Sequence, residues 1–301
     1  MSGTPYPQAG DHAPPPTQAA LGYRSVQGVR VPTFLYGTAW KESDTARLTQ
    51  LALARGFRGI DTANQRKHYH EAGVGEGLKR AMGSVPLARD EVFLQTKFTF
   101  RDAQDHRLPY DPRAPVGRQV VQSFESSLEH LGVHHLDAYL LHGPSRRGGL
   151  AGADWEAWRA MEELQRAGRT KLIGVSNVMA SQLGELRARA RVPPALVQNR
   201  CFARPESDRA VRALCEANGI LYEGFSLLTA IPEVLRHPVF VEIATKSGMT
   251  SEQALFRFVL ERGVVALTGT LSERHMSQDL TVYGLPLHPA DGAVMAGLLG
   301  W

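Results

Sequence analysis

Ionisable side chains lie in three apolar segments of this sequence. Asp61 lies in RGIDTA (58–63), Lys97 ends VFLQTK (92–97) and His142 ends LDAYLLH (136–142). Two further apolar segments end in polar side chains, namely Ser176, Asn177, Gln198 and Asn199. Taken singly, each ionisable residue could be a helix cap, a rim lysine or a core histidine. A carboxylate, an ammonium group and an imidazole that converge in one pocket are instead typical of a site that moves protons.

The elements that carry these residues repeat one unit along the chain. Eight short apolar segments rich in β-branched residues predict strands at 34–37, 58–63, 92–97, 136–142, 171–177, 195–199, 220–226 and 264–269. Segments with helical periodicity occur at 44–55, 74–82, 114–132, 154–167, 180–190, 206–218 and 251–262. This alternation predicts a parallel sheet covered on both faces. Eight repeats predict an α/β protein closed into a (β/α)8 TIM barrel, with its active site at the C-terminal strand ends.

One barrel accounts for most of the 301 residues, and we expect a single barrel domain over residues 21–301. Residues 1–20 carry five prolines and few apolar side chains, which predicts a disordered arm. The rival fold, an open doubly wound sheet that binds a dinucleotide, needs Gly-x-Gly-x-x-Gly after its first strand. Here Gly73 and Gly75 are followed by Leu78, so the fingerprint fails.

The composition argues against several classes of protein. Gly, Pro or a charge interrupts the apolar stretches before the roughly 18 residues of a membrane-spanning helix, and the N-terminus lacks the apolar region of a signal peptide. We therefore expect a cytoplasmic protein with no membrane partner. The net charge of +4 comes with no nucleic-acid motif, so no nucleic acid is expected. Cys201 and Cys215 predict reduced thiols, and His68 and His70 lack the further ligands that zinc requires, so no metal is expected.

Over about residues 30–280 the chain resembles the aldo-keto reductases. The resemblance lies in GTAWK (37–41), GFRGIDTA (56–63), EAGVGEGL (71–78), LQTKF (94–98), LDAYLLHGP (136–144), KLIGVSN (171–177), LVQN (196–199) and GFSLL (224–228). The catalytic Asp, Lys and His of that family correspond to Asp61, Lys97 and His142. The usual spacing of the catalytic Tyr falls on other residue types, but the loop NQRKHYHE is two residues longer than usual and holds one tyrosine, Tyr69. The resemblance thus implies reduction of an aldehyde or ketone to an alcohol, with Tyr69 as general acid.

The resemblance also implies a nicotinamide cofactor, and we expect NADPH, with NADH as the alternative. The residues expected to bind it are Gly37, Thr38, Asp61, Ser176, Asn177, Gln198, Phe225, Ser226, Leu227, Thr268, Gly269, Thr270, Arg274 and His275. Many relatives hold the 2′-phosphate with a Lys-Ser pair. Leu267 and Thr268 replace that pair here, so Arg274 and His275 are the expected phosphate ligands.

The expected partner is a small carbonyl substrate bound by Trp40, His70 and Gly143, in a monomer or weak homo-oligomer. Gly143 stands where the family frequently has tryptophan, which predicts a wider pocket. The alternative function is a regulatory or scaffold protein that binds the cofactor but does not turn over. Consumption of NADPH in the presence of aldehydes distinguishes the two hypotheses.

Overall fold

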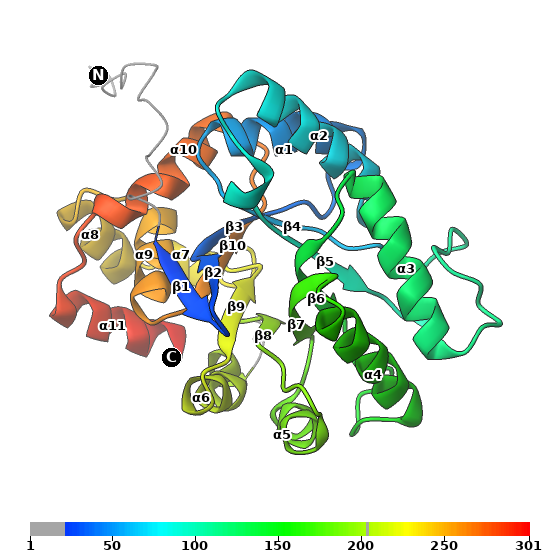
Figure 1. The fold of residues 1–301 in the computed structure, drawn as a ribbon. Coiled ribbons are helices and arrows are strands. Elements are labelled where there is room, and N and C mark those ends of the chain that lie inside the picture. Colours follow the sequence, from blue (N-terminus) through cyan, green and yellow to red (C-terminus); the bar gives the residue numbers. More distant parts are fainter. Residues whose placement is uncertain (1–21, 203–204) are drawn as a thin grey trace.

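The computed structural model describes residues 22–202 and 205–301, and the predicted disordered arm at 1–20 lies outside them. Eight parallel strands form a closed barrel in the order β10-β3-β4-β5-β6-β7-β8-β9 (Figure 1). The strands are β3 Phe34–Gly37, β4 Gly59–Asp61, β5 Phe93–Phe98, β6 Leu136–Leu141, β7 Thr170–Ser176, β8 Leu196–Arg200, β9 Leu221–Phe225 and β10 Val265–Thr268. This arrangement confirms the predicted (β/α)8 barrel.

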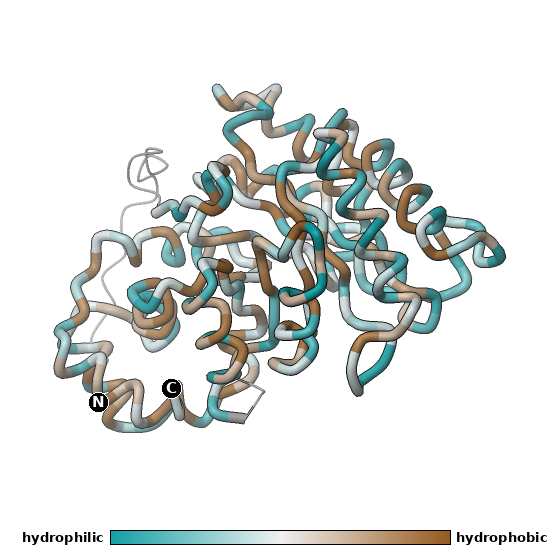
Figure 2. Tube along the Cα trace, turned by 60° about the horizontal axis from the view of Figure 1, so that its bottom comes forward, coloured by the Kyte–Doolittle hydropathy of each residue, from teal (hydrophilic) through white to brown (hydrophobic). Residues whose placement is uncertain are grey.

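Helices surround the barrel and alternate with its strands (Figure 1). Those predicted from the sequence are α1 Thr45–Ala54, α2 Glu71–Ser84, α3 Val116–Leu131, α4 Gly152–Arg166, α5 Ala180–Arg189, α6 Arg209–Ala217 and α9 Ser251–Glu261. In α3 the residues Val120, Phe124 and Leu128 repeat every four positions and are buried. The helix ends at Gly132, which adopts a left-handed φ of 67°. Figure 2 shows the same alternation of hydrophobic and hydrophilic residues along the helices.

A two-stranded hairpin precedes the barrel and was not predicted. Its strands, β1 (Tyr23–Val26) and β2 (Val29–Pro32), are antiparallel. They are joined through Gln27 and Gly28, both with positive φ, as a tight hairpin turn requires. Val26 and Val31 belong to the same buried cluster as Phe93, the first residue of β5. The hairpin therefore closes the N-terminal end of the barrel, opposite the expected active site.

The sequence analysis gave no bounds for four further helices, although the repeating unit implies a helix after the strand at 264–269. They are α7 Pro232–Leu235, α8 Pro238–Lys246, α10 Glu273–Thr281 and α11 Pro289–Leu299. Three of them begin with proline, whose fixed φ suits the first helical position. Within the described residues, no helix combines the length and apolar character needed to cross a membrane.

The barrel interior changes from apolar to polar toward the C-terminal strand ends. Four side chains form a polar layer there: Asp61, Gln95, Gln198 and Glu223, all buried. The Gln95 amide nitrogen donates to Asp61 Oδ1 and Glu223 Oε2, both at 2.8 Å. The Gln198 amide nitrogen donates to the same two oxygens, both at 2.9 Å. Two amides thus bridge two carboxyl groups inside a closed barrel.

Glu223 is fully buried, and two effects raise the pKa of its carboxyl from 4.5 to about 7. Burial is the larger cause, and the nearby Asp61 carboxylate adds to it. Glu223 Oε1 and Gln95 Oε1 are both buried, and neither has a hydrogen-bond partner among the described residues. A proton on Glu223 therefore also supplies a donor to a region rich in acceptors.

This raised pKa predicts how the stability of the fold depends on pH. Between about pH 4.5 and 7 the unfolded chain releases a proton that folded Glu223 keeps, so the free energy of unfolding falls as pH rises. The free energy of unfolding of Glu223→Gln, measured relative to that of the wild type, should therefore rise by up to about 3 kcal/mol between pH 4.5 and pH 8. The reason is that the amide has no proton to lose. Urea denaturation across this range measures the difference. Parallel stability curves for the two proteins would show that Glu223 is ionised in the fold throughout.

Candidate active site

Asp61 and Lys97 form a buried ion pair at the centre of the barrel mouth. Lys97 Nζ donates to Asp61 Oδ1 at 2.6 Å and to the Thr62 carbonyl at 2.8 Å. Lys97 is 0% exposed and Asp61 is 3% exposed. Asp61 ends β4 and pairs with Gln95, two residues before Lys97 on β5, so strand alternation directs these side chains to the same face. This geometry keeps both charges in a site with little water.

Tyr69 lies beside this pair, on the loop between β4 and α2. Lys97 Nζ is 5.6 Å from the centroid of the Tyr69 ring. The long loop turns back on itself, because the backbone N–H groups of His68 and Tyr69 both donate to the Gln65 carbonyl. Burial raises the pKa of the Tyr69 phenol, and the Asp61 carboxylate raises it further. The phenol therefore keeps its proton at neutral pH.

His142 completes the group at the end of β6. Its ring packs edge-on against Tyr69, with centroids 5.9 Å apart and an interplanar angle of 71°. Its Nδ1 lies 2.6 Å from the Thr99 hydroxyl. Burial lowers the pKa of His142 to about 3, and the charges of Lys97 and His68 contribute to the shift. The imidazole is therefore neutral at physiological pH, and the structure brings all four predicted catalytic residues together.

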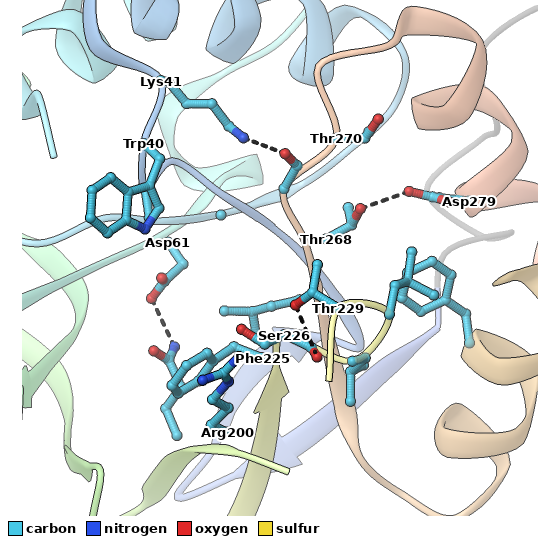
Figure 3. Close-up of a pocket in the computed structure, with 18 of the residues that line it drawn as sticks. Trp40, Lys41, Asp61, Arg200, Phe225, Ser226, Thr229, Thr268, Thr270 and Asp279 are labelled. Carbon is cyan, nitrogen blue, oxygen red and sulfur yellow. Dashed lines mark hydrogen bonds between the residues drawn. The ribbon is translucent and has the colours of Figure 1, made fainter. Parts of the chain in front are cut away.

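A single cavity of about 1080 Å³ opens beside these residues (Figure 3). Sixteen of the predicted site residues line it: Gly37, Trp40, Asp61, Tyr69, His142, Ser176, Asn177, Gln198, Phe225, Ser226, Leu227, Thr268, Gly269, Thr270, Arg274 and His275. The cavity runs from the ion pair to the first turn of α10. Its volume exceeds what a small carbonyl compound fills, so it has room for a second, larger ligand.

Four predicted site residues do not line this cavity. Lys97 lies behind Asp61, and the buried Thr38 hydroxyl donates to the Asp61 carbonyl at 3.0 Å. His70 Nδ1 lies 3.3 Å from the Glu42 carbonyl, outside the cavity. Gly143 has no side chain to reach the cavity, and a Cβ placed on it would meet Asn177 Cβ at 3.5 Å. The structure therefore places Trp40, but not His70 or Gly143, in the cavity wall.

Two polar residues of the wall sit at strand ends in an unusual backbone conformation. Asn177 follows β7 with a φ of 54°, and Ser226 follows β9 with the same value. Asparagine adopts this left-handed conformation more readily than most residues. The Asn177 side-chain amide donates to the His142 carbonyl at 2.8 Å. This bond links the ends of β6 and β7 below the cavity.

Several cavity residues escaped the sequence analysis. They include Lys41, Gln65, Arg200, Thr229, Glu252, Gln253, Gln278 and Asp279. Lys41 Nζ donates to the Gly269 carbonyl, which joins the first loop to the last (Figure 3). Asp279 accepts a hydrogen bond from Thr268 at 2.8 Å, and burial raises the pKa of its carboxyl to about 7. The position of Lys41 in GTAWK was a usable signal, whereas Asp279 lies in α10, for which the sequence analysis gave no bounds.

Two further aspects of the cavity mouth are an aromatic contact between Trp40 and His68 and the question of metal binding. The indole of Trp40 stacks on the His68 ring, with centroids 3.9 Å apart. His68 has a lowered pKa because of burial first and the charge of Lys67 second. Within residues 22–202 and 205–301, no group of three or more His, Cys, Asp or Glu side chains could hold a metal ion.

Known proteins share both this sequence and this architecture. A protein-family model described as "Aldo/keto reductase family" matches residues 33–230. The chain is 31% identical over 266 residues to an uncharacterized oxidoreductase, YtbE, of Bacillus subtilis, with 88% of each chain covered. It is 30% identical over 288 residues to NADPH-dependent codeinone reductase 1-4 of Papaver somniferum, covering 88% of this chain and 85% of that protein.

A solved structure agrees with these sequence matches. The crystal structure of an aldo/keto reductase from Brucella melitensis superimposes with a TM-score of 0.78 at 26% identity, covering 92% of this chain and 99% of the other. The family model spans more than half of the chain, and it includes the strands that carry Asp61, Lys97 and His142. The chain therefore belongs to the aldo/keto reductase family of oxidoreductases.

Proposed function

We propose that this protein reduces an aldehyde or ketone to the alcohol with NADPH, and that Tyr69 is the proton donor. One observation carries the proposal: Asp61, Lys97, Tyr69 and His142 meet at one end of a cavity that is large enough for a dinucleotide beside its substrate. The proposed substrate is a small carbonyl compound that enters along Trp40.

The remaining wall of the cavity fits a nicotinamide dinucleotide. Both protons of the Gln198 amide are donated to carboxyl groups, so its oxygen is left to accept a hydrogen bond from a carboxamide. Ser176 and Asn177 add polar groups beside it, and Phe225 offers an aromatic face for a planar ring. Residues 268–270 lead into α10 at the far end, where Arg274 and His275 are exposed to the cavity. A phosphate there would meet a helix N-terminus and two basic side chains.

NADPH is favoured over NADH for two reasons. The basic pair at the far end suits a 2′-phosphate. The codeinone reductase that is 30% identical to this chain is named as NADPH-dependent. Asp279 lies near this end, but burial raises its pKa to about 7, so it carries only part of a negative charge at neutral pH.

The bound cofactor would supply a hydride to the carbonyl carbon, and this chain must then supply a proton to the carbonyl oxygen. Tyr69 holds that proton, since its phenol stays neutral at physiological pH. Two of the three N–H groups of the Lys97 ammonium donate to Asp61 and to the Thr62 carbonyl, and the third has no acceptor among the described residues. This group stabilises the phenolate when Tyr69 gives up its proton. Asp61 keeps the ammonium in position through a charge-assisted bond.

One prediction of the proposed function concerns the proton donor. Tyr69→Phe keeps the ring but removes its proton, so kcat for a model aldehyde should fall by about 10²–10⁴-fold. The dissociation constant for NADPH should change little, because the hydroxyl makes no hydrogen bond to the described residues that shape the cofactor end. Steady-state absorbance of NADPH and fluorescence titration measure the two quantities.

The matched control is Tyr283→Phe, because that phenol bonds to Thr33 at 2.8 Å on the hairpin side of the barrel. Its kcat should remain at the wild-type level. If Tyr69→Phe retains more than about a third of wild-type kcat, general acid catalysis by Tyr69 is excluded. If the wild type oxidises no NADPH with any aldehyde yet still binds it, the non-catalytic alternative replaces the proposal.

A second prediction concerns the cofactor. Wild type should bind NADPH more tightly than NADH, and Arg274→Ala should weaken NADPH binding by about 10-fold, because one charge-assisted phosphate contact is lost. NADH binding should be unaffected by the substitution. Arg118→Ala, which removes an exposed arginine on α3 outside the cavity, is the control. Equal losses for both cofactors would place Arg274 away from the 2′-phosphate.

A further inference from the structure

Thr99 lies behind His142 and is the only described side chain that contacts its ring nitrogens by hydrogen bonding. Thr99 follows β5, is 2% exposed and does not line the cavity. Its hydroxyl is 2.6 Å from His142 Nδ1. Its carbonyl accepts from the Tyr110 hydroxyl at 2.8 Å, so the backbone that carries the hydroxyl is also held. The contact therefore joins two well-anchored groups.

The direction of this hydrogen bond follows from counting donors and acceptors. A threonine hydroxyl always has a proton to donate, and a buried hydroxyl needs an acceptor for it. Among the described residues, His142 Nδ1 is the only partner of the Thr99 hydroxyl. If Nδ1 carried the proton and donated to Thr99, the hydroxyl proton would be buried without an acceptor. Donation from Thr99 to Nδ1 satisfies both groups.

A neutral imidazole carries one proton, which must then reside on Nε2. His142 is neutral because burial and the charge of Lys97 lower its pKa to about 3. Its ring lines the cavity beside Tyr69, so an Nε2–H can donate to a carbonyl oxygen there. The opposite tautomer would present a lone pair to that oxygen and repel it.

We propose that Thr99 is a positioning residue that holds His142 as the Nε2–H tautomer, so that the imidazole donates a hydrogen bond to the substrate carbonyl while Tyr69 supplies the proton. The inference rests on the proposed function, since it assigns part of the same site. It adds a residue that touches neither the substrate nor the cofactor. Thr99 acts through the proton position on one ring.

The test compares Thr99→Val, which keeps the shape and removes the hydroxyl, with Thr99→Ser, which keeps the hydroxyl. The full-length protein is labelled with 15N-histidine and its ring nitrogens are observed by NMR without any ligand, using His142→Gln to assign the signals. Wild type and Thr99→Ser should show an unprotonated Nδ1 and a protonated Nε2 at His142. Thr99→Val should show a mixture of tautomers, because Nδ1 loses its donor.

Activity provides the second readout. Thr99→Val should lower kcat for a model aldehyde by about 10-fold, the value of one hydrogen bond, with the NADPH dissociation constant unchanged. Thr99→Ser should stay within about two-fold of wild type. Thr96→Val is the matched control for general destabilisation, because it removes a buried hydroxyl on the same strand that bonds to Glu71 away from His142. It should lower the melting temperature and leave the His142 signals unchanged.

Each outcome bears on the proposal separately from the reductase function. A protonated Nδ1 in wild type overturns it, as does a Thr99→Val protein with full kcat. Loss of activity in Thr99→Ser equal to that in Thr99→Val also overturns it, since a restored hydroxyl would then have no effect. If wild type shows the Nε2–H tautomer but reduces no carbonyl compound, the tautomer assignment stands and the proposed reaction fails.

Discussion

The rest of the active site depends on one buried ion pair, Lys97 with Asp61. Removing an ammonium and a carboxylate from water costs on the order of several kcal/mol of desolvation free energy for each group. A buried pair is therefore stable only when hydrogen bonds satisfy both partners. The barrel supplies them: the Thr62 carbonyl accepts from Lys97, and the Gln95 and Gln198 amides donate to the same Asp61 oxygen. The polar layer in the barrel interior therefore supplies part of the hydrogen bonding that holds the carboxylate of this pair.

This pair sets the charge state of its neighbours. The Lys97 charge helps to keep His142 neutral, and the Asp61 charge helps to keep the Tyr69 phenol and the Glu223 carboxyl protonated. The centre of the site therefore holds the charges of Lys97 and Asp61 beside a neutral phenol and a neutral imidazole, and Glu223 below them carries only part of a negative charge at neutral pH. A neutral phenol and a neutral imidazole are suited to donate hydrogen bonds to an oxygen that gains negative charge.

The strands and the convergence of Asp61, Lys97 and His142 could be predicted from the sequence. The apolar segments locate the strands, and the alternation of strands with helices makes the strands parallel, so their C-terminal ends meet at one end of the barrel. Gln95 and Thr99 were missed, although Gln95 on β5 and Thr99 directly after it continue the alternation of positions that includes Lys97. The hairpin escaped because it precedes the first repeat of the strand and helix unit, so the repeating pattern does not include it. His70 and Gly143 were expected in the pocket, but His70 Nδ1 lies against the Glu42 carbonyl and Gly143 has no side chain to reach the wall. Loop conformations depend on tertiary contacts that local sequence patterns do not contain.

The position of Trp40 at the cavity mouth affects the fluorescence of the protein. It has a left-handed φ of 61°, is 67% exposed and stacks on His68 at the cavity mouth. The chain has three other tryptophans, and none of them lines the cavity; Trp158 lies on the buried face of α4, and Trp301 packs against Phe258 and Arg212. A ligand that enters the cavity therefore changes the surroundings of one indole out of four. The protein thus carries its own fluorescent reporter of occupancy, and no label has to be attached to follow binding.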